Sequence, residues 1–569
     1  MAPQLTSTAS AGLPAGLSLP ALTPLNVVGL LFLGLFVHLA VKVFRASRSP
    51  LYNVPGEPSH NWIVGDFPHM LSEPTGVLQK RYINKHGHTI RTSTGMFSPP
   101  GIITSDLTAL GYLQRNPDLF IKPPKQSRAL RALAGDGVLM AEFHSHRRQR
   151  RILNPAFSPA AIRDMTPVFY AKAEELRERI ATVIDDDPKH DASPTPPKPE
   201  DIVPGSRKLD MGKYLTELAF DVIGMAGFDY DFRCQQTSNP IVSGFRGALS
   251  ALMRINALAV AQHFWPALEV IPTKRNLEVA ASLKRTTDVG RELVAQKRRE
   301  LLAAEGGIEK STETGKDLLS LIVKANMAQD LPENQRLSDE EIIYQVSTFL
   351  LAGSETTSNG LSWVLWRLAQ NPDLQRRLRE ELSSVGNPEP SLDELNELHL
   401  LENVVRETLR IDSPVPETIR EATADTMLPL AEPITGVDGT VMTSIPIRKG
   451  TFIVEPFLAV HSNTKIWGDD AEVFNPDRFD RPNCPAMKVP GSYGNLLSFN
   501  GGARNCIGYR FALLEMKVVL FILLRNFTFD ILPSKPEITR KNFIVMLPWV
   551  VGEEHVGSQM PLLVGHVRD

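Results

Sequence analysis

The pattern of apolar residues is densest near the start of the chain, where the segment Leu25–Phe44 contains Lys42 as its single charged residue. A helix of these twenty residues is about 30 Å long, which matches the hydrocarbon thickness of a bilayer. The basic residues Arg45 and Arg48 follow the segment, and no charged residue precedes it. Because basic residues favour the cytosolic side, we expect one transmembrane helix with residues 1–24 in the lumen.

A basic, proline-rich hinge is expected at 45–58, and a single body is expected at 59–569. A cleaved secretory signal or a buried core helix is the alternative interpretation of Leu25–Phe44. A signal carries a basic N-terminal region and a small-residue cleavage site, and neither is evident in this sequence. We therefore expect a membrane anchor that is retained.

A long helix is predicted near the middle of the chain, from a capping box at Ser338–Glu341 to the pair Asn371-Pro372 that ends it. Apolar residues recur between these two signals at helical spacing, over about 48 Å of helix. Near its centre, the segment Ala352–Thr357 brings together a glycine, an acid and consecutive threonines. Taken alone, this segment is typical of a packing notch with a solvated acid.

Strand patterns are short and few. The segment Thr89–Thr104 predicts a hairpin around Gly95 and the Pro99-Pro100-Gly101 turn. The stretch 185–208 holds six prolines, so it cannot be one helix, and we expect it to be an exposed insertion in the body. The remaining patterns are mainly helical.

Composition and charge narrow the class of protein. Hydrophobic residues make up 42% of the 569 residues and charged residues 22%, which excludes a wholly disordered chain or a collagen-like fibre. The 61 Lys and Arg residues nearly balance the 64 Asp and Glu residues, for a formal net charge of −3. This balance gives no indication of a nucleic-acid partner.

The chain has three cysteines, which is too few for a disulfide framework, and no Cys-x-x-Cys pair indicates a zinc site. Cys234 and Cys484 are typical of buried structural thiols. Any chemistry of a thiol is therefore expected from the third cysteine, Cys506.

Cys506 stands in a glycine-rich segment. Gly501 and Gly502 permit backbone conformations that are closed to other residues, and Gly508 allows a flat ligand or another backbone to approach. A helical pattern begins at the cysteine, and Arg504 adds positive charge two residues before it. Because helix-start amides and cations stabilise a thiolate, we predict a lowered pKa for Cys506.

The pattern Phe-x-x-Gly-x-Arg-x-Cys-x-Gly at Phe499–Gly508 resembles the haem-binding loop of the cytochrome P450 superfamily. Four further segments resemble motifs of that family in the expected order: His146–Arg150, with His in place of the usual Trp, Ala352–Thr357, Glu407–Arg410, and Phe474–Phe479, with Asp where Glu is usual. A single Glu-x-x-Arg is common in helices. Together and in order, these motifs make the chain similar to the family from Leu51 to its C-terminal region.

The resemblance implies a mostly α fold with a small β-rich region, the cytochrome P450 fold, preceded by the N-terminal transmembrane helix. It implies heme b (haem b), with iron on the thiolate of Cys506, between the long helix and the cysteine loop. It also implies a microsomal anchor, and hence a single-pass protein of the endoplasmic reticulum membrane with a cytosolic catalytic domain.

The resemblance also implies roles for the other candidate residues. Cys506 is the expected axial and metal ligand, and the expected haem contacts are Phe499, Gly502, Arg504, His146, Arg150 and Arg420, with the cations on the propionates. Glu355 and Thr356 are the implied catalytic acid–alcohol pair, which relays protons. The implied structural ion-pair triad is Glu407, Arg410 and Arg478, and the implied substrate pocket is lined by Phe349, Ala352, Val415 and Thr418.

The implied function is a haem-thiolate monooxygenase that inserts one oxygen atom from dioxygen into a lipophilic small molecule, in fungal secondary metabolism such as terpenoid or polyketide tailoring. Because the sequence shows no flavin or dinucleotide motif, electrons are expected from an NADPH–cytochrome P450 reductase, docked on the basic run Arg147, Arg148, Arg150 and Arg151. The alternatives are a haem-thiolate isomerase, dehydratase or peroxygenase, and a non-catalytic haem-binding membrane protein.

Overall fold

The computed structural model describes residues 24–61, 65–93, 95, 99–125, 127–185, 194–253, 258, 262, 268, 271–305, 315–328, 331–481, 488–542 and 544–567. The expected luminal segment, up to residue 23, lies outside the described residues. So do Cys484 and residues 186–193 of the proline-rich stretch.

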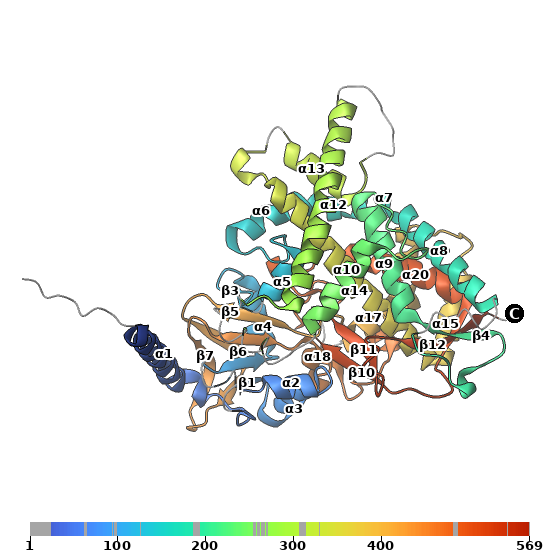
Figure 1. The fold of residues 1–569 in the computed structure, drawn as a ribbon. Coiled ribbons are helices and arrows are strands. Elements are labelled where there is room, and N and C mark those ends of the chain that lie inside the picture. The colour runs from blue at the N-terminus through green and yellow to red at the C-terminus, as the bar shows by residue number, and fades with distance from the viewer. Residues whose placement is uncertain are drawn as a thin grey trace, which may run out of the picture.

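Helices dominate the described body and gather on one side of a smaller β-rich region (Figure 1). In chain order they are α1 (Pro24–Ser47), α2 (Phe67–Ser72), α3 (Val77–His86), α4 (Leu107–Arg115), α5 (Ser127–Ala134), α6 (Phe143–Leu153), α7 (Pro159–Asp164), α8 (Thr166–Asp185), α9 (Met211–Phe228), α10 (Pro240–Met253), α12 (Lys274–Glu305), α13 (Leu318–Met327), α14 (Asp339–Ala369), α15 (Pro372–Ser383), α16 (Leu392–Glu397), α17 (His399–Ile411), α18 (Phe457–His461), α19 (Thr464–Trp467) and α20 (Tyr509–Asn526). The predicted fold class, mostly α with a small β-rich region, is confirmed.

The β-rich region is built on a five-stranded sheet of order β1-β2-β8-β5-β3. The strands are β1 (Thr89–Thr92), β2 (Gly101–Thr104), β3 (Phe120–Ile121), β4 (Ser206–Asp210), β5 (Thr418–Ala422), β6 (Thr426–Thr435), β7 (Val441–Ile447), β8 (Phe452–Glu455), β9 (Phe527–Asp530), β10 (Ile538–Asn542), β11 (Met546–Val550) and β12 (Pro561–His566). Strands β1 and β2 pair antiparallel, as the predicted hairpin requires. The pairs β6–β7 and β10–β11 form two further small sheets. The sheet β4-β12-β9 lies apart from the five-stranded sheet, against α8, α9 and α14 (Figure 1).

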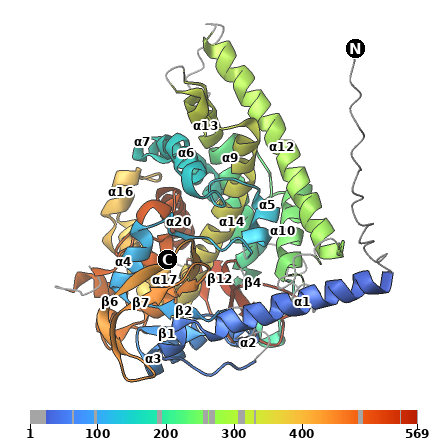
Figure 2. The same cartoon turned by 90° about the vertical axis from the view of Figure 1, so that its left-hand side faces the viewer.

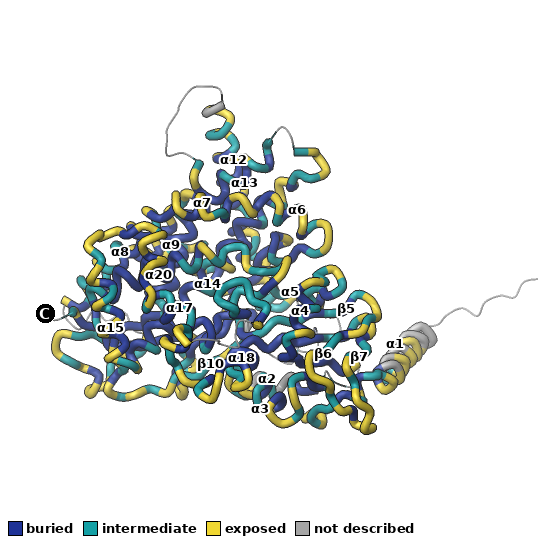
Figure 3. The backbone as a smooth tube through the Cα atoms, turned by 180° about the vertical axis from the view of Figure 1, so that it is seen from behind, coloured by how far each residue is buried: buried dark blue, intermediate teal, exposed yellow. Residues whose placement is uncertain are grey.

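The long helix α14 passes through the centre of the helical side, in contact with α9, α12, α17 and α20 (Figure 2). The predicted capping box between Ser338 and Glu341 is present, and the helix ends before Asn371. Gly353 lies where α9 packs tightly against α14, because a Cβ there would stand 3.2 Å from the side chain of Ile223. The tube in Figure 3 is dark blue along much of α14, α17 and α20, so the core surrounds this central helix.

Helix α1 contains the segment expected to cross the membrane and extends beyond it to Ser47. It projects away from the β-rich side of the body (Figures 1 and 3). Several of its apolar side chains are exposed, namely Leu33, Phe36, Val37, Val41 and Phe44. Within the described residues, none of the helices combines the length and the apolar character that crossing a membrane requires. A helix over residues 25–44 is therefore confirmed, and a transmembrane span is not.

The proline-rich stretch 185–208 is only partly the exposed insertion that the sequence predicts. Asp201 is buried, and its carboxylate accepts hydrogen bonds from the backbone N and the Oγ of Ser534, at 2.9 Å each. Residues from Ser206 onward form β4, which pairs with β12. The described residues 194–205 are otherwise exposed or partly exposed, as predicted, so the prediction is wrong only for Asp201 and for the start of β4, because prolines prevent a helix but leave room for a short edge strand.

Candidate active site

The cysteine loop lies between the turn η9 (Leu497–Phe499) and helix α20, and the Cys506 backbone N donates to Phe499 O at 2.9 Å. Gly502 has a φ of +63°, and a Cβ there would lie 2.6 Å from the carbonyl oxygen of Gln114 on α4. Both the conformation and the close approach require glycine, as the sequence predicts.

The two other glycines of the loop differ from Gly502. Gly501 has extended backbone, and glycine is required there because a Cβ would overlap the Gln114 side chain and Pro490 O. At Gly508 a Cβ would meet only Phe157, at 3.6 Å, which is ordinary contact. The protein itself therefore explains Gly501 and Gly502, and it leaves the surface over Gly508 open to a ligand.

The thiol environment differs from the prediction. The Cys506 side chain is accessible, yet protein surrounds it closely enough that desolvation raises its pKa above the ordinary value. The Gly508 N–H and the charge of Arg150 act in the opposite direction and are weaker. The predicted lowering of the pKa is wrong for the protein alone, because desolvation outweighs the backbone N–H and the nearby positive charge on which the prediction relied.

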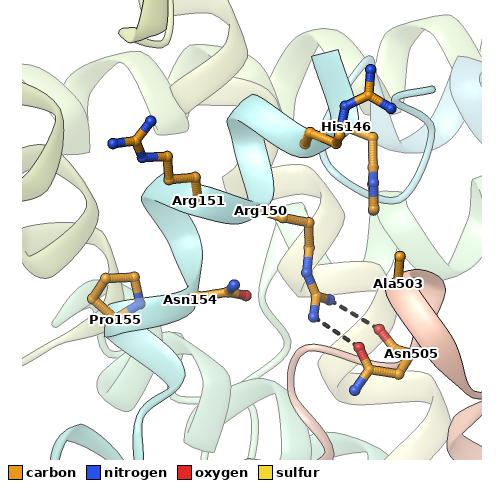
Figure 4. Close-up of a pocket in the computed structure, with 8 residues that line it drawn as sticks. His146, Arg150, Arg151, Asn154, Pro155, Ala503 and Asn505 are labelled. Carbon is orange, nitrogen blue, oxygen red and sulfur yellow. Dashed lines mark hydrogen bonds between the residues drawn. The ribbon is translucent and has the colours of Figure 1, made fainter. Parts of the chain in front are cut away.

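Helix α6 places two of the predicted haem contacts, His146 and Arg150, beside the cysteine loop (Figure 4). The Arg150 guanidinium donates to O and to Oδ1 of Asn505, at 2.9 Å each, and Asn505 directly precedes Cys506. Arg150 thus connects α6 to the loop, a contact that the family pattern does not indicate. Burial, with Lys122 and Arg150 nearby, lowers the pKa of His146 to about 4, so the ring is neutral and has one N–H to donate.

A hollow of about 630 Å³ opens between α6 and the cysteine loop (Figure 4). It is lined by His146, Arg147, Arg150, Arg151, Asn154, Pro155, Ala503 and Asn505. The arginines make it a basic hollow, and its wall includes the residue next to the cysteine.

Further cations lie close to this loop. Arg504 donates to Ala141 O at 2.7 Å and pairs with Glu142, while Arg420 donates to Glu455 Oε1 at 3.2 Å. Burial holds the pKa of Lys122 well below its ordinary value, and the charges of Arg420 and Arg504 lower it further. Lys122 lies 3.9 Å from Glu142, the carboxylate that also pairs with Arg504, so two of these cations share one carboxylate.

Polar atoms near these cations lack partners in the part of the chain that the structure describes. Nη1 of Arg420, Nε of Arg504 and Oε2 of Glu455 are buried and make no hydrogen bond. Unpaired guanidinium donors and nearby positive charge suit a ligand with carboxylate groups, as the propionates of haem are. The donor set therefore fits haem. Lys122 was not among the predicted haem contacts. The sequence marks it only as a cation directly after the short apolar strand β3.

In the central notch of α14, Thr356 is the most accessible polar residue, whereas Ser354, Glu355 and Thr357 are buried. Thr356 is partly accessible, and its Oγ1 donates to Ala352 O at 2.6 Å, one helical turn earlier. Ala352 is exposed although most of α14 is buried. Glu355 is buried, and desolvation raises its pKa, an effect that the charge of Arg246 on α10 partly opposes.

The predicted ion-pair triad is assembled at the core. Glu407 and Arg410 lie one turn apart on α17, and Arg478 comes from the turn η7 (Pro476–Asp480). The Glu407 carboxylate accepts from Nε of both arginines at 2.8 Å, and all three residues are essentially inaccessible. Backbone carbonyls of Ala471, Val473 and Trp467 take further guanidinium donors.

The predicted pocket residues differ in accessibility. Ala352 is exposed, whereas Val415 and Thr418 are partly buried. Phe349 is buried, with its ring edge-to-face on Phe157 at 5.4 Å between ring centroids. Phe499 is partly buried between Tyr493 and Tyr509. Phe349 therefore contributes to the core, and Ala352 offers the accessible surface at the notch.

An accessible cysteine in a glycine-held loop, near arginines that keep unpaired buried donor atoms, is the arrangement of a haem-thiolate protein. The chain belongs to the cytochrome P450 family, whose family model matches residues 55–549. As a member, it carries haem on a cysteine thiolate and is an oxidoreductase.

Fungal relatives cover nearly the whole chain. Cytochrome P450 monooxygenase 205 of Postia placenta is 39% identical over 534 residues, which are 92% of this chain and 94% of the relative. Ganoderic acid synthetase CYP5150L8 of Ganoderma lucidum is 33% identical over 517 residues, 86% and 89% of the two chains. Cytochrome P450 monooxygenase claO of Ampulloclitocybe clavipes is 30% identical over 557 residues, 95% and 98%. The chain is thus a cytochrome P450 monooxygenase, which uses a redox partner and a small-molecule substrate.

Proposed function

We propose that this chain inserts one oxygen atom of dioxygen into a lipophilic small molecule in fungal secondary metabolism, such as terpenoid or polyketide tailoring. The observation that carries the proposal is the Glu355–Thr356 pair, a buried acid with a raised pKa beside an accessible hydroxyl on α14. The relative that is named a ganoderic acid synthetase supports a role in secondary metabolism. An isomerase or dehydratase has no need of such a proton relay.

Cys506 is the proposed axial ligand. When bound, haem supplies dioxygen activation, which an electron-donating thiolate favours. The propionates are bound in this proposal by Arg504, Arg420, Arg150, Lys122 and the N–H of the neutral His146. Arg504 and Arg420 keep unpaired buried donor atoms, and the cations supply positive charge.

The acid–alcohol pair moves protons in this proposal. Because burial raises the pKa of Glu355, its carboxyl keeps a proton at pH values where an exposed carboxyl has lost it. The Thr356 hydroxyl donates a hydrogen bond to Ala352 O, so its oxygen remains an acceptor toward the accessible side of the helix. A water that donates to this oxygen is positioned for a proton from Glu355 to pass toward the reacting site.

The basic hollow beside α6 is the proposed docking site of an NADPH–cytochrome P450 reductase. Arg147 is exposed and pairs with the exposed Asp118 at 2.5 Å, and Arg151 is exposed as well. Arg148 pairs with Glu341 and donates to Arg336 O, so it stabilises the fold and is not part of this docking surface. Asn505 lines the hollow and directly precedes Cys506, so an acidic partner that binds in the hollow lies next to the cysteine.

Helix α1 is the proposed endoplasmic reticulum anchor, with the catalytic body in the cytosol. The support is its exposed apolar side chains, its projection from the body and the basic residues that follow it. A chain without residues 1–48 should be more soluble and still bind haem.

The proposed activity is tested with purified protein, the reductase and isotopically labelled dioxygen. A screen for substrate-induced changes in the haem spectrum first selects a lipophilic substrate. We expect label in the product and a strict requirement for NADPH. Product formed without NADPH or without label would support the isomerase or dehydratase alternative.

Docking is tested separately by charge reversal. Arg147→Glu with Arg151→Glu should weaken reductase-supported turnover, most strongly at low salt, because exposed charges steer association. Arg376→Glu is the matched control, since Arg376 is as exposed as Arg147 and pairs with Glu380 within α15, which lies well away from α6 in Figure 1. Equal losses in both variants would show that α6 is not the docking surface.

A further inference from the structure

A buried histidine connects the ion-pair triad to the cysteine loop. His461 ends α18, is 1% exposed, and carries no role in the family motifs discussed above. Its Nδ1 lies 3.0 Å from Arg410 O, and its Nε2 accepts from the Leu497 backbone N at 2.9 Å. The Arg410 guanidinium in turn donates to the His461 carbonyl. The ring therefore bridges helix α17 and the turn η9.

The two partners of the ring determine its protonation. A backbone N–H only donates, so Nε2 must accept from Leu497, and a carbonyl only accepts, so Nδ1 must carry the proton toward Arg410. Burial and the nearby Arg410 charge lower the pKa of His461 to about 3, so the ring is neutral at physiological pH. An imidazolium could not accept the Leu497 hydrogen bond.

The contact leads to Cys506 through one short turn. Leu497 is the first residue of η9, whose last residue, Phe499, accepts the backbone N–H of Cys506 at 2.9 Å. The turn closes through Asn500 N, which donates to Leu497 O at 2.7 Å. One end of the turn is thus held by His461 through Leu497 N, and the other end, Phe499, binds the backbone of Cys506.

We propose that His461 is a positioning residue for the axial-ligand loop, which it keeps in the geometry that presents the Cys506 thiolate to haem iron. This inference rests on Cys506 as the ligand. The hydrogen bonds of the His461 ring go to Arg410 and Leu497, so it acts on the cysteine through Leu497 and Phe499. Loss of the His461 acceptor should therefore weaken the bond between the Cys506 thiolate and the haem iron. A general loss of stability would not affect this bond more than the rest of the fold.

Two substitutions separate the donor from the acceptor of the ring. The amide of Asn reaches the position of Nδ1, so His461→Asn can still donate to Arg410 O but leaves the Leu497 N–H buried and unpaired. The longer Gln places its amide oxygen near the position of Nε2, so His461→Gln still accepts from Leu497. The proposal predicts that the Gln variant, and not the Asn variant, keeps the thiolate.

The measurement uses the full haem-loaded chain in sub-denaturing urea and follows the decay of the thiolate-type carbon monoxide spectrum. We expect His461→Asn to lose this spectrum about tenfold faster than the unmodified protein, the effect of one unpaired buried donor. We expect His461→Gln to remain within about twofold.

Gln375→Leu is the matched control for stability. Gln375 is also a buried side chain that bridges two elements, since it accepts from Phe529 N at 3.0 Å and donates to Phe529 O at 2.8 Å, between α15 and β9. The Gln375→Leu substitution should lower the urea midpoint of unfolding without a tenfold faster loss of the thiolate-type spectrum. Equal decay in the Asn and Gln variants, no effect of Asn, or equally fast decay in Gln375→Leu would overturn the proposal. An error in the ligand assignment would show differently, as a thiolate-type spectrum that survives Cys506→Ala.

Discussion

Replacement of Glu407 by Gln tests how much the buried ion-pair triad contributes to the fold. The Glu407 carboxylate accepts four hydrogen bonds: from Nε and Nη2 of Arg410 at 2.8 Å each, from Nε of Arg478 at 2.8 Å and from the Asn475 backbone N at 2.9 Å. In Glu407→Gln, the amide nitrogen brings hydrogen-bond donors against donors. The two guanidinium groups also lose the charge that compensates them.

The expected cost follows from burial. Glu407, Arg410 and Arg478 are at most 1% exposed, so water cannot replace the lost partner. Removal of one member of a buried ion pair costs about 3–5 kcal/mol, a large part of the ~5–15 kcal/mol that stabilises a typical domain. We therefore expect a large drop in the urea midpoint of unfolding, and less haem retained.

Glu380→Gln is the control, because it makes the same chemical change in a helical ion pair at the surface. Glu380 pairs with Arg376 at 2.7 Å, and both side chains are about 60% exposed. Such a pair contributes about 0.3–0.5 kcal/mol, so the midpoint should hardly move. Urea unfolding is followed by circular dichroism for both holoproteins under the same conditions. Similar midpoints for the two variants would refute the reasoning from burial.

Other predictions concern the ligand, the relay, pH and the anchor. Cys506→Ala should abolish the thiolate-type carbon monoxide spectrum, which Cys234→Ala should retain, since Cys234 is a buried thiol whose pKa is raised. Thr356→Ala should consume NADPH but release peroxide, so the ratio of product to NADPH should fall, and a normal ratio would count against the relay. The pKa of His461 is about 3 in the folded protein and 6.5 in the unfolded chain, so the unfolded chain binds more protons between these two pH values. The urea midpoint of unfolding should therefore fall as the pH drops through this window, and it should fall less in His461→Gln. Deletion of residues 1–48 should leave haem binding intact, measured as haem per chain.

Local features of this protein were predictable from the sequence. The capping box at Ser338 and the Asn371-Pro372 pair set the ends of α14, because caps and prolines act through neighbouring backbone atoms. Gly502 was predicted to need a special conformation and has a φ of +63°. The triad residues were predictable because family motifs record which residues must meet.

The partners of charged residues needed the tertiary structure. Arg148 and Arg150 look alike in the basic run, yet one pairs with Glu341 and the other with Asn505. No periodicity marks Lys122 as a cation near Arg420 and Arg504, which we propose bind haem, because these neighbours come from distant parts of the chain.

The sequence by itself thus determined the long central helix, the cysteine in its glycine-held loop and the family. The tertiary structure alone decided the direction of the Cys506 pKa shift and the bridge that His461 makes to Leu497. The physical reason is range. Caps, turns and helical periodicity act over a few neighbouring residues, whereas desolvation and buried hydrogen bonds depend on which distant segments surround a group after folding.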